Sequence, residues 1–401
     1  MKYIFTRYRD IAMLCLCIIC LFLFLIFLPK VFSDHYIFSQ SVISETLATT
    51  KVKAVFVPSY VPTPKIVKGI YMTSWTASNN NLRGGLVKLV DDTELNTVVI
   101  DIKDYSGKIV FPIENNSALK SYGSEEVRIR DLPEFIESLH RKNIYVIGRI
   151  AVFQDAYFVK YRPDLAVKNK SGTEIWKDYK GISWIDAGSR EYWDYIVLLA
   201  KEARKIGFDE VNFDYIRFPS DGNMQDISYT WSSTTPKSLV LKEFFQYLHE
   251  NLQDLGLKIS ADIFGLVTSA KDDMGIGQIL ENVLPYFDYI DPMVYPSHYA
   301  PDFQGFKDPE AHPYDVVHFA MQSALERANK LDLIAASSTP AVENTHYGAR
   351  LRPWLQDFGL KMDYGPSEVR AQIQATNDIG LSSWILWSAS NKYTQGALSD
   401  K

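Results

Sequence analysis

Short apolar runs rich in β-branched residues alternate with longer stretches of helical period from Lys68 to the carboxyl terminus. Short apolar or alternating runs are typical of strands, whereas apolar residues three and four positions apart are typical of helices. The pattern predicts strands at residues 68–75, 97–104, 144–153, 210–218, 258–265, 289–296, 350–358 and 382–390. Helices are predicted between them at residues 132–143, 190–207, 238–256, 316–330 and 366–380. Several of these helices end on Gly or Asn, as helix C-caps do.

Strands separated by helices pair in parallel through right-handed crossovers. The repeated units within residues 66–401 therefore predict an α/β fold, a single (β/α)8 TIM barrel with long loops. An open doubly wound sheet is the alternative, which is less favoured because no Gly-rich dinucleotide-binding turn follows the first strand. Two stretches complicate the count, since residues 107–112 predict a small hairpin and residues 333–340 an extra strand.

The amino-terminal region has a different pattern. Residues 11–29, IAMLCLCIICLFLFLIFLP, carry no charge, and at ~1.5 Å per residue such a helix spans a bilayer core of roughly 30 Å. Lys2, Arg7 and Arg9 precede this run, so residues 1–10 are expected in the cytoplasm and the rest of the chain outside the cell membrane. We therefore predict a single-pass transmembrane signal-anchor at 11–29, followed by a Pro-containing spacer at 30–65.

A cleaved signal peptide is the rival interpretation of this segment and would make the protein secreted. The apolar run is long for a signal peptide, and no small-x-small cleavage site follows it. A lipoprotein site at Cys20 is weaker, because Ile19 stands where a small residue is usual. All three cysteines (Cys15, Cys17 and Cys20) lie in this segment, so the remainder has no disulfide and no cysteine-ligated metal.

The net charge and the aromatic content limit the classes of partner that the protein is expected to bind. Residues 1–30 hold four of the 42 basic residues and one of the 48 acidic ones, so the remainder has a formal net charge of −9 against −6 for the whole chain. That balance argues against nucleic acid as a partner. The aromatic fraction is high at 13%, which fits either a large core or a cleft whose rings stack on sugars.

The strand ends carry the candidate chemistry, because the carboxyl ends of TIM-barrel strands face the active site. In FDEVNFDYIRFPSDG, residues 208–222, apolar and polar positions alternate through Val211, Phe213 and Tyr215, and the polar phase carries Asn212 and Asp214. The other strand ends contribute Asp101, Lys103, Asp104, Arg149, Arg217, Asp262, Asp291, Tyr295, Ser297, His298, Arg352, Gln356, Asp357, Trp384 and Trp387. Any one acid has an equally good structural explanation, but four successive strands that each end in Asp favour a charged, functional cleft.

Several reaction classes are disfavoured by the motifs that are missing from the sequence. None of the seven histidines forms an HxH or HxxxH pair, so we predict no metal site. There is no GxSxG, no cysteine outside the amino-terminal segment and no GxxxxGK[ST]. We predict no cofactor. Carboxylate-pair chemistry among aromatic residues remains, and cleavage of a glycosidic bond needs such a pair.

Seven segments, in this order, resemble a known family. They are VVIDIKDYSG, YVIGRIAVFQD, the paired W-x-D motifs at 176–178 and 184–186, GFDEVNFDYIRFPSDG, DPMVYPSHY, RPWLQDF and WILWSASNKY. Together they resemble a bacterial "putative glycoside hydrolase" family, a domain of unknown function whose TIM barrels are distantly similar to the α-amylase type. The resemblance covers residues 68–393 and implies a polysaccharide-directed role.

The resemblance also implies roles for individual residues. The nucleophile of α-amylase-like barrels ends strand four, which corresponds to Asp214, and their third carboxylate on strand seven corresponds to Asp357. Their acid/base is a Glu that ends strand five, where this chain has Asp262. Asn212 also replaces an Arg that usually precedes the nucleophile by two residues. These departures leave Asp291 as a rival to Asp262 for the acid/base role.

The sequence therefore predicts a membrane-anchored, extracytoplasmic glycoside hydrolase or transglycosylase acting on an envelope or extracellular polysaccharide. Its expected catalytic carboxylates are Asp214, Asp262 or Asp291, and Asp357. The expected substrate-binding residues are Asp101, Lys103, Arg149, Asn212, Arg217, Tyr295, His298, Trp354 and Trp387. Core packing is an equally good explanation for the last four rings. The alternatives are an inactive glycan-binding barrel and a scaffold for other envelope proteins.

Overall fold

The computed structural model describes residues 56–338 and 346–401. Residues 58–401 form one compact unit. The predicted cytoplasmic segment 1–10, the predicted anchor 11–29 and most of the predicted spacer 30–65 lie outside the described residues. Within the described ranges, no helix combines the length and the apolar character needed to cross a bilayer.

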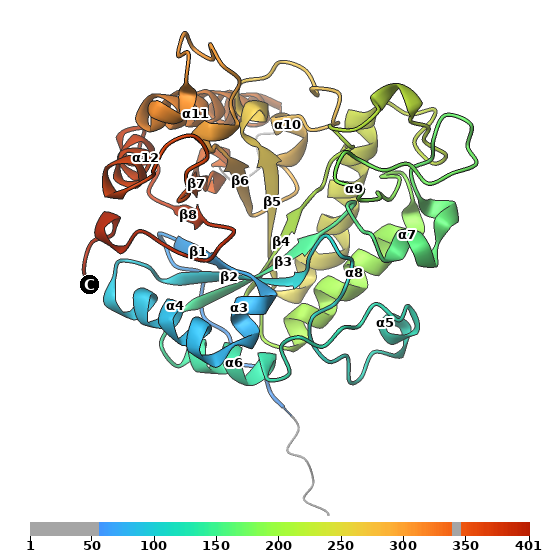
Figure 1. The fold of residues 1–401 in the computed structure, drawn as a ribbon, viewed down its shortest axis with the longest axis horizontal. Coiled ribbons are helices and arrows are strands. Elements are labelled where there is room, and N and C mark those ends of the chain that lie inside the picture. Colours follow the sequence, from blue (N-terminus) through green and yellow to red (C-terminus); the bar gives the residue numbers. More distant parts are fainter. Residues whose placement is uncertain (1–55, 339–345) are drawn as a thin grey trace, which may run out of the picture. The chain divides into compact units, whose positions relative to one another are not determined.

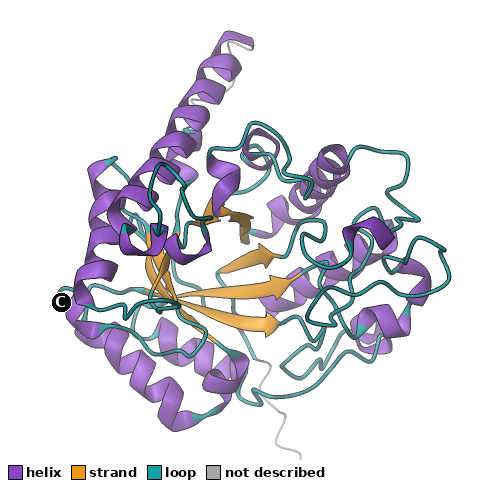
Figure 2. Cartoon of the chain, turned by 45° about the horizontal axis from the view of Figure 1, so that its top comes forward, coloured by secondary structure: helices purple, strands orange, loops and turns teal. Residues whose placement is uncertain are grey.

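Eight parallel strands close into a barrel in sequence order, and helices surround them (Figures 1 and 2). Closure confirms the predicted TIM barrel and excludes the open doubly wound sheet. The strands are β1 (Lys68–Met72), β2 (Thr97–Lys103), β3 (Tyr145–Ala151), β4 (Glu210–Asp214), β5 (Lys258–Phe264), β6 (Tyr289–Met293), β7 (Trp354–Gln356) and β8 (Trp384–Trp387).

The helices follow the strands around the barrel. They are α3 (Ser74–Ser78), α4 (Asn80–Asp92), α5 (Ser117–Ser121), α6 (Leu132–His140), α7 (Phe158–Tyr161), α8 (Arg190–Lys205), α9 (Lys237–Leu252), α10 (Leu280–Val283), α11 (Pro313–Ser338) and α12 (Pro366–Asp378). The extra strand predicted at 333–340 is wrong as far as residue 338, because α11 continues through it. The run LIAA consists largely of good helix formers, which extend a helix that is already nucleated. The hairpin predicted at 107–112 is reduced to single bridges from Ile109 to Lys103 and to Glu125.

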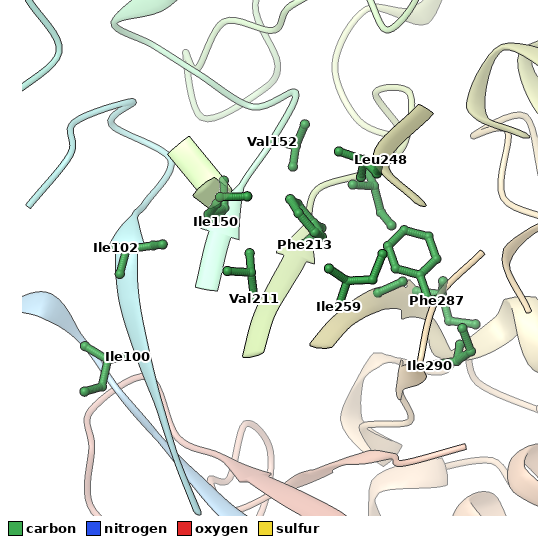
Figure 3. Packing of buried hydrophobic residues seen from close by; sticks show 14 of the residues in the cluster. Ile100, Ile102, Ile150, Val152, Val211, Phe213, Leu248, Ile259, Phe287 and Ile290 are labelled. Carbon is green, nitrogen blue, oxygen red and sulfur yellow. The ribbon is translucent and has the colours of Figure 1, made fainter. Parts of the chain in front are cut away.

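Strand β4 explains how an apolar strand carries buried carboxylates. Val211 and Phe213 point away from the barrel axis into the layer between strands and helices, with residues such as Leu248 of α9 (Figure 3). Successive side chains on a strand point to opposite faces, so Glu210, Asn212 and Asp214 face the interior. The strand is shorter than predicted, because Tyr215 adopts φ +53° and turns the chain out of the sheet.

The segment before β1 lies against the amino-terminal ends of the strands. The backbone N–H of Val61 donates to Asp209 Oδ1 at 2.8 Å, and Thr63 Oγ1 donates to the hydroxyl of Tyr145 at 3.2 Å. Tyr60 donates to the carbonyl of Arg204 at 2.9 Å. Residues 58–65, which the sequence assigns to the spacer, thus contact the barrel at the end opposite its mouth.

Candidate active site

The lowest polar layer of the barrel interior is an ion cluster centred on Arg352. Its guanidinium donates to Glu210 Oε1 at 2.5 Å and to Asp291 Oδ1 and Oδ2 at 2.9 Å. All three side chains are fully buried. Burial raises the pKa of Asp291 to about 6, although the charge and hydrogen bonds of Arg352 act in the opposite direction.

Asn212 connects this cluster to the next carboxyl group. Its Nδ2 lies 3.1 Å from Asp291 Oδ2, 3.1 Å from Ser260 Oγ and 2.8 Å from Asp262 Oδ1. Trp354 Nε1 donates to the same Asp262 Oδ1 at 2.7 Å. Asn212 and Trp354 are therefore buried hydrogen-bond donors to Asp262. The sequence had predicted both as substrate-binding residues.

Asp262 lies in an environment that favours its protonated form. Burial raises its pKa well above the usual aspartate value, and the nearby charges of Asp214 and Asp291 raise it further. The charge of Arg149 and the hydrogen bond from Asn212 lower the pKa but do not reverse the shift.

Asp214, on the neighbouring strand, has a cationic partner instead. Arg149 donates from Nη2 and Nε to Asp214 Oδ2 at 2.5 and 3.1 Å, and from Nη1 to Asp101 Oδ1 at 2.7 Å. Asp214 Oδ1 accepts the backbone N–H of Tyr215 at 2.6 Å. Asp101 also accepts the hydroxyl of Tyr71, and burial raises its pKa. Arg149 therefore holds two carboxylates, and only Asp214 of the two reaches the cavity described next.

A cavity of about 460 Å³ lies at the carboxyl ends of the strands. The charged residues in its lining are Arg149, Lys180, Asp214, Arg217, Asp221 and Asp262. The rings in its lining are Tyr215, Phe264, Tyr295, His298, Tyr299 and Trp387. Acid groups, cations and aromatic faces thus meet in one space of a size suited to a small ligand or a few sugar units.

Some predicted site residues lie away from this lining. Asp101, Asn212, Asp291 and Trp354 are buried around or beneath the residues that form it. Asp357 is bound instead by Thr394, whose N–H and Oγ1 donate to it at 2.9 and 2.6 Å. All five residues therefore lie outside the cavity lining, where they support its walls or the surrounding structure.

Lys103 is the clearest departure from the predicted cleft. It forms an ion pair with Asp155 at 2.8 Å and donates to the carbonyl of Ala151, and both ionic side chains are fully buried. The pairing register between β2 and β3 shifts between Asp101 and Lys103. Because one extra residue reverses which face a side chain occupies, Lys103 points toward Tyr192 of α8, to whose hydroxyl it donates.

Sequence reasoning also missed residues that line the cavity. Lys180 and Asp221 come from the long loops after β3 and β4. Asp221 lies in the quoted FPSDG segment, and Lys180 lies between the two W-x-D motifs. Their position in or beside these motifs is the feature of the sequence that could have identified them as cavity residues. In the described part of the chain, no group of three His, Cys, Asp or Glu side chains is arranged to hold a metal ion.

Solved structures show where this fold occurs. The glycoside hydrolase domain of PgaB (BpsB) from Bordetella bronchiseptica matches with a TM-score of 0.56 and 13% identity, covering 82% of this chain and 95% of that one. That likeness concerns the fold. A hypothetical protein from Ruminiclostridium thermocellum is 32% identical over 52% of this chain and 98% of its own, with a TM-score of 0.44. Among curated proteins, none matches.

A family model described as "Putative glycosyl hydrolase domain" matches residues 69–393. The match spans the barrel from β1 to the loop after β8, and so includes every residue of the cavity lining. It also agrees with the family resemblance carried by the seven segments. The chain therefore belongs to this glycosyl hydrolase family.

Proposed function

We propose that the barrel hydrolyses glycosidic bonds of a polysaccharide, with Asp214 and Asp262 as the carboxylate pair. The observation that carries this proposal is the contrast between the two acids, which line one cavity from adjacent strands. Asp214 is ion-paired with Arg149, whereas burial raises the pKa of Asp262. Two carboxyl groups in such different environments are suited to different roles, one as a proton donor and one as a carboxylate.

In this mechanism Asp262 donates its proton to the glycosidic oxygen. Its two hydrogen-bond donors, Asn212 and Trp354, both bind Oδ1, so Oδ2 is the atom that carries the transferable proton. The bond from the anomeric carbon to that oxygen breaks, and the leaving sugar departs as an alcohol.

Asp214 acts on the sugar that becomes electron-deficient at its anomeric carbon. As an anion it either activates the water that attacks that carbon or attacks the carbon directly. In the direct route, water activated by the deprotonated Asp262 then cleaves the ester to Asp214 and releases the sugar. Arg149 positions Asp214 through two hydrogen bonds to Oδ2. Tyr295, His298 and Trp387 offer faces for sugar rings along the same cavity.

The proposal extends to the location of the protein. The uncharged run at residues 11–29, with basic residues before it, supports a membrane anchor that leaves the barrel outside the cytoplasm. The substrate would then be an envelope or extracellular polysaccharide.

A direct test compares the full-length chain with Asp214→Asn on a panel of bacterial cell-wall and capsular polysaccharides. Released oligosaccharides are read by mass spectrometry, and binding to each polymer is recorded in parallel. We expect products from the unaltered chain and a loss of about 10³-fold or more in the variant, with binding retained. Asp357→Asn is the matched control, since Asp357 does not line the cavity. Equal binding by all three proteins with no product from any would instead support a glycan-binding barrel.

A further inference from the structure

Three cations line the cavity, and they differ in how their charge is balanced. Arg149 forms ion pairs with Asp214 at 2.5 Å and with Asp101 at 2.7 Å. Arg217 and Lys180 line the same cavity, and among the described residues no carboxylate oxygen lies within 4.0 Å of a side-chain nitrogen of either one. The charge of Arg149 is therefore used by two carboxylates of the site. The charges of Arg217 and Lys180 are available to a ligand in the cavity.

Arg217 is held in place without a direct ion pair, although the carboxylates of Asp214, Asp221 and Asp178 lie near enough to oppose the lowering of its pKa by burial. Arg217 is 8% exposed, and its guanidinium carbon lies 4.8 Å from the ring centre of Trp184 and 4.5 Å from that of Phe264. Nη1 donates to the carbonyl of Phe218 at 3.0 Å and to Ser220 Oγ at 3.2 Å. Both hydrogen bonds come from Nη1, so the N–H groups on Nε and Nη2 have no acceptor among the described residues and can bind a ligand.

A buried cation without a direct ion pair is costly. Burial lowers the pKa of Arg217, and the surrounding acidic groups act in the opposite direction without reversing the shift. The cost falls when an anion enters the cavity, because a guanidinium forms two parallel hydrogen bonds with a carboxylate or a phosphate. A neutral hydroxyl would satisfy an N–H group but would leave the cation without an ion pair.

Asp221 supplies the complementary feature. It lines the same cavity, and its Oδ1 is buried without a hydrogen-bond partner in the structure. An acceptor in this position suits a sugar hydroxyl, which donates a hydrogen bond. The region around Arg217 therefore offers cationic N–H donors beside the carboxylate of Asp221, one oxygen of which has no hydrogen-bond partner.

We propose that this cavity binds a sugar unit carrying an anionic substituent, a carboxylate or a phosphate, and that Arg217 binds the substituent. Lys180 adds a second cation at the cavity wall, and Asp221 accepts a hydroxyl of the same unit. The inference rests on the proposed glycan-directed function and narrows its substrates to acidic polysaccharides.

The test measures binding rather than cleavage, so that it is independent of whether the barrel is an active hydrolase. The probes are hyaluronan oligosaccharides with their carboxyl-reduced neutral derivative, and phosphomannan oligosaccharides with their phosphatase-treated derivative. Each pair shares one backbone and differs in charge. Binding to the full-length chain is followed by tryptophan fluorescence at low temperature, which slows any cleavage of the probe. Two tryptophans are suitable reporters, since Trp184 lies beside Arg217 and Trp387 lines the cavity.

The unaltered chain is expected to bind the anionic member of at least one pair about tenfold or more tightly than its neutral partner. Arg217→Gln should abolish that preference. Arg217→Lys should retain part of it, because lysine keeps the positive charge but cannot form the two parallel hydrogen bonds of a guanidinium. Arg190→Gln is the matched control, since Arg190 is an exposed arginine of α8 that pairs with Glu243 and lies over Trp193. Thermal unfolding of each variant establishes that it is folded.

Two results would overturn the proposal. One is a chain that binds no anionic probe better than its neutral partner, which needs no variant to observe. The other is an anionic preference that survives in folded Arg217→Gln. A preference for hyaluronan over its neutral derivative would identify the bound group as a carboxylate, and a preference for phosphomannan would identify it as a phosphate. A preference without any release of oligosaccharides would uphold the anionic subsite and contradict the hydrolase proposal, so the two failures are distinguishable.

Discussion

Asp214 and Asp262 are neighbours on adjacent strands, and their surroundings separate their chemistry. One is paired with a guanidinium, and the other receives only neutral N–H donors from Asn212 and Trp354. Desolvation opposes charge on a carboxyl group unless a cation compensates it. The same residue type can therefore serve as a proton donor on β5 and as an anion on β4.

A variant of the proposed acid tests this division. Asp262→Asn should lower the rate of polysaccharide hydrolysis by about 10²–10⁴-fold, because the leaving sugar is no longer protonated. The loss should be much smaller for an aryl glycoside of the same sugar whose phenolate leaves without protonation. Rates on both substrates give the answer, and an equal loss on the two would assign Asp262 a role other than proton donor.

The pH dependence of kcat/KM gives a second test at the same residue. Asp262 donates its proton only in the acid form, so activity is present below its raised pKa and falls as the pH rises through it. Asn212→Ala removes a hydrogen bond that lowers this pKa, and the alkaline limb should move to higher pH.

Thr394→Val is the control for the pH test, because Thr394 binds Asp357 outside the cavity lining. Its alkaline limb should coincide with that of the unaltered chain. An alkaline limb that does not move in Asn212→Ala would mean that another group controls it.

The sequence predicted individual site residues where the strand alternation is regular. Asp214 and Asp262 follow the inward phase of β4 and β5 and reach the cavity. Lys103 does not, since the register shift after Asp101 reverses its direction, and no local pattern announces such a shift. Lys180 and Asp221 lie on long loops, whose paths depend on tertiary contacts rather than on periodicity.

At the scale of elements, the eight strands were predictable because hydrophobic period and element type agree along most of the chain. Their ends were less so. β4 stops at Asp214 although the predicted strand continues to Phe218, because Tyr215 takes a left-handed conformation. The strand prediction is wrong at residues 333–338 because a short apolar run fits a strand and a helix equally well, and here the run continues the long helix α11.

The Arg352 cluster ties three strand regions together and allows a stability prediction. Arg352→Met would leave Glu210 and Asp291 buried without their cation, and we expect a loss of about 3–5 kcal/mol in the free energy of unfolding. Urea denaturation measures it. Arg190→Met breaks an exposed pair with Glu243 and should cost less than about 1 kcal/mol. Similar losses for both variants would contradict a central structural role for the cluster.

At the scale of the whole molecule, the barrel unit has two distinct ends. The segment that leads into β1 contacts Asp209 and Tyr145 at the amino-terminal ends of the strands. The cavity opens at the carboxyl ends. Residues 58–65 therefore lie against the barrel on the side away from the proposed glycan site.

Cell fractionation tests the proposed anchor. The full-length chain should sediment with membranes and resist extraction by salt, whereas a chain lacking residues 1–30 should be recovered in the soluble fraction with its glycan binding intact. The intact mass of the membrane-bound protein checks that the apolar run is retained. Recovery of a shortened, released protein from full-length expression would instead identify the run as a cleaved signal peptide.

In the proposed reaction, water replaces a sugar at an anomeric carbon in this cavity, and isotopic labelling of the water follows that replacement. Polysaccharide is incubated with the full-length chain in H₂¹⁸O, the products are reduced at once with borodeuteride so that the label does not exchange, and their masses are read. Hydrolysis predicts one ¹⁸O at each newly formed reducing end after reduction, and no such labelled product with Asp214→Asn. Products without the label would show that the bond is broken by transfer or elimination, and would contradict the account.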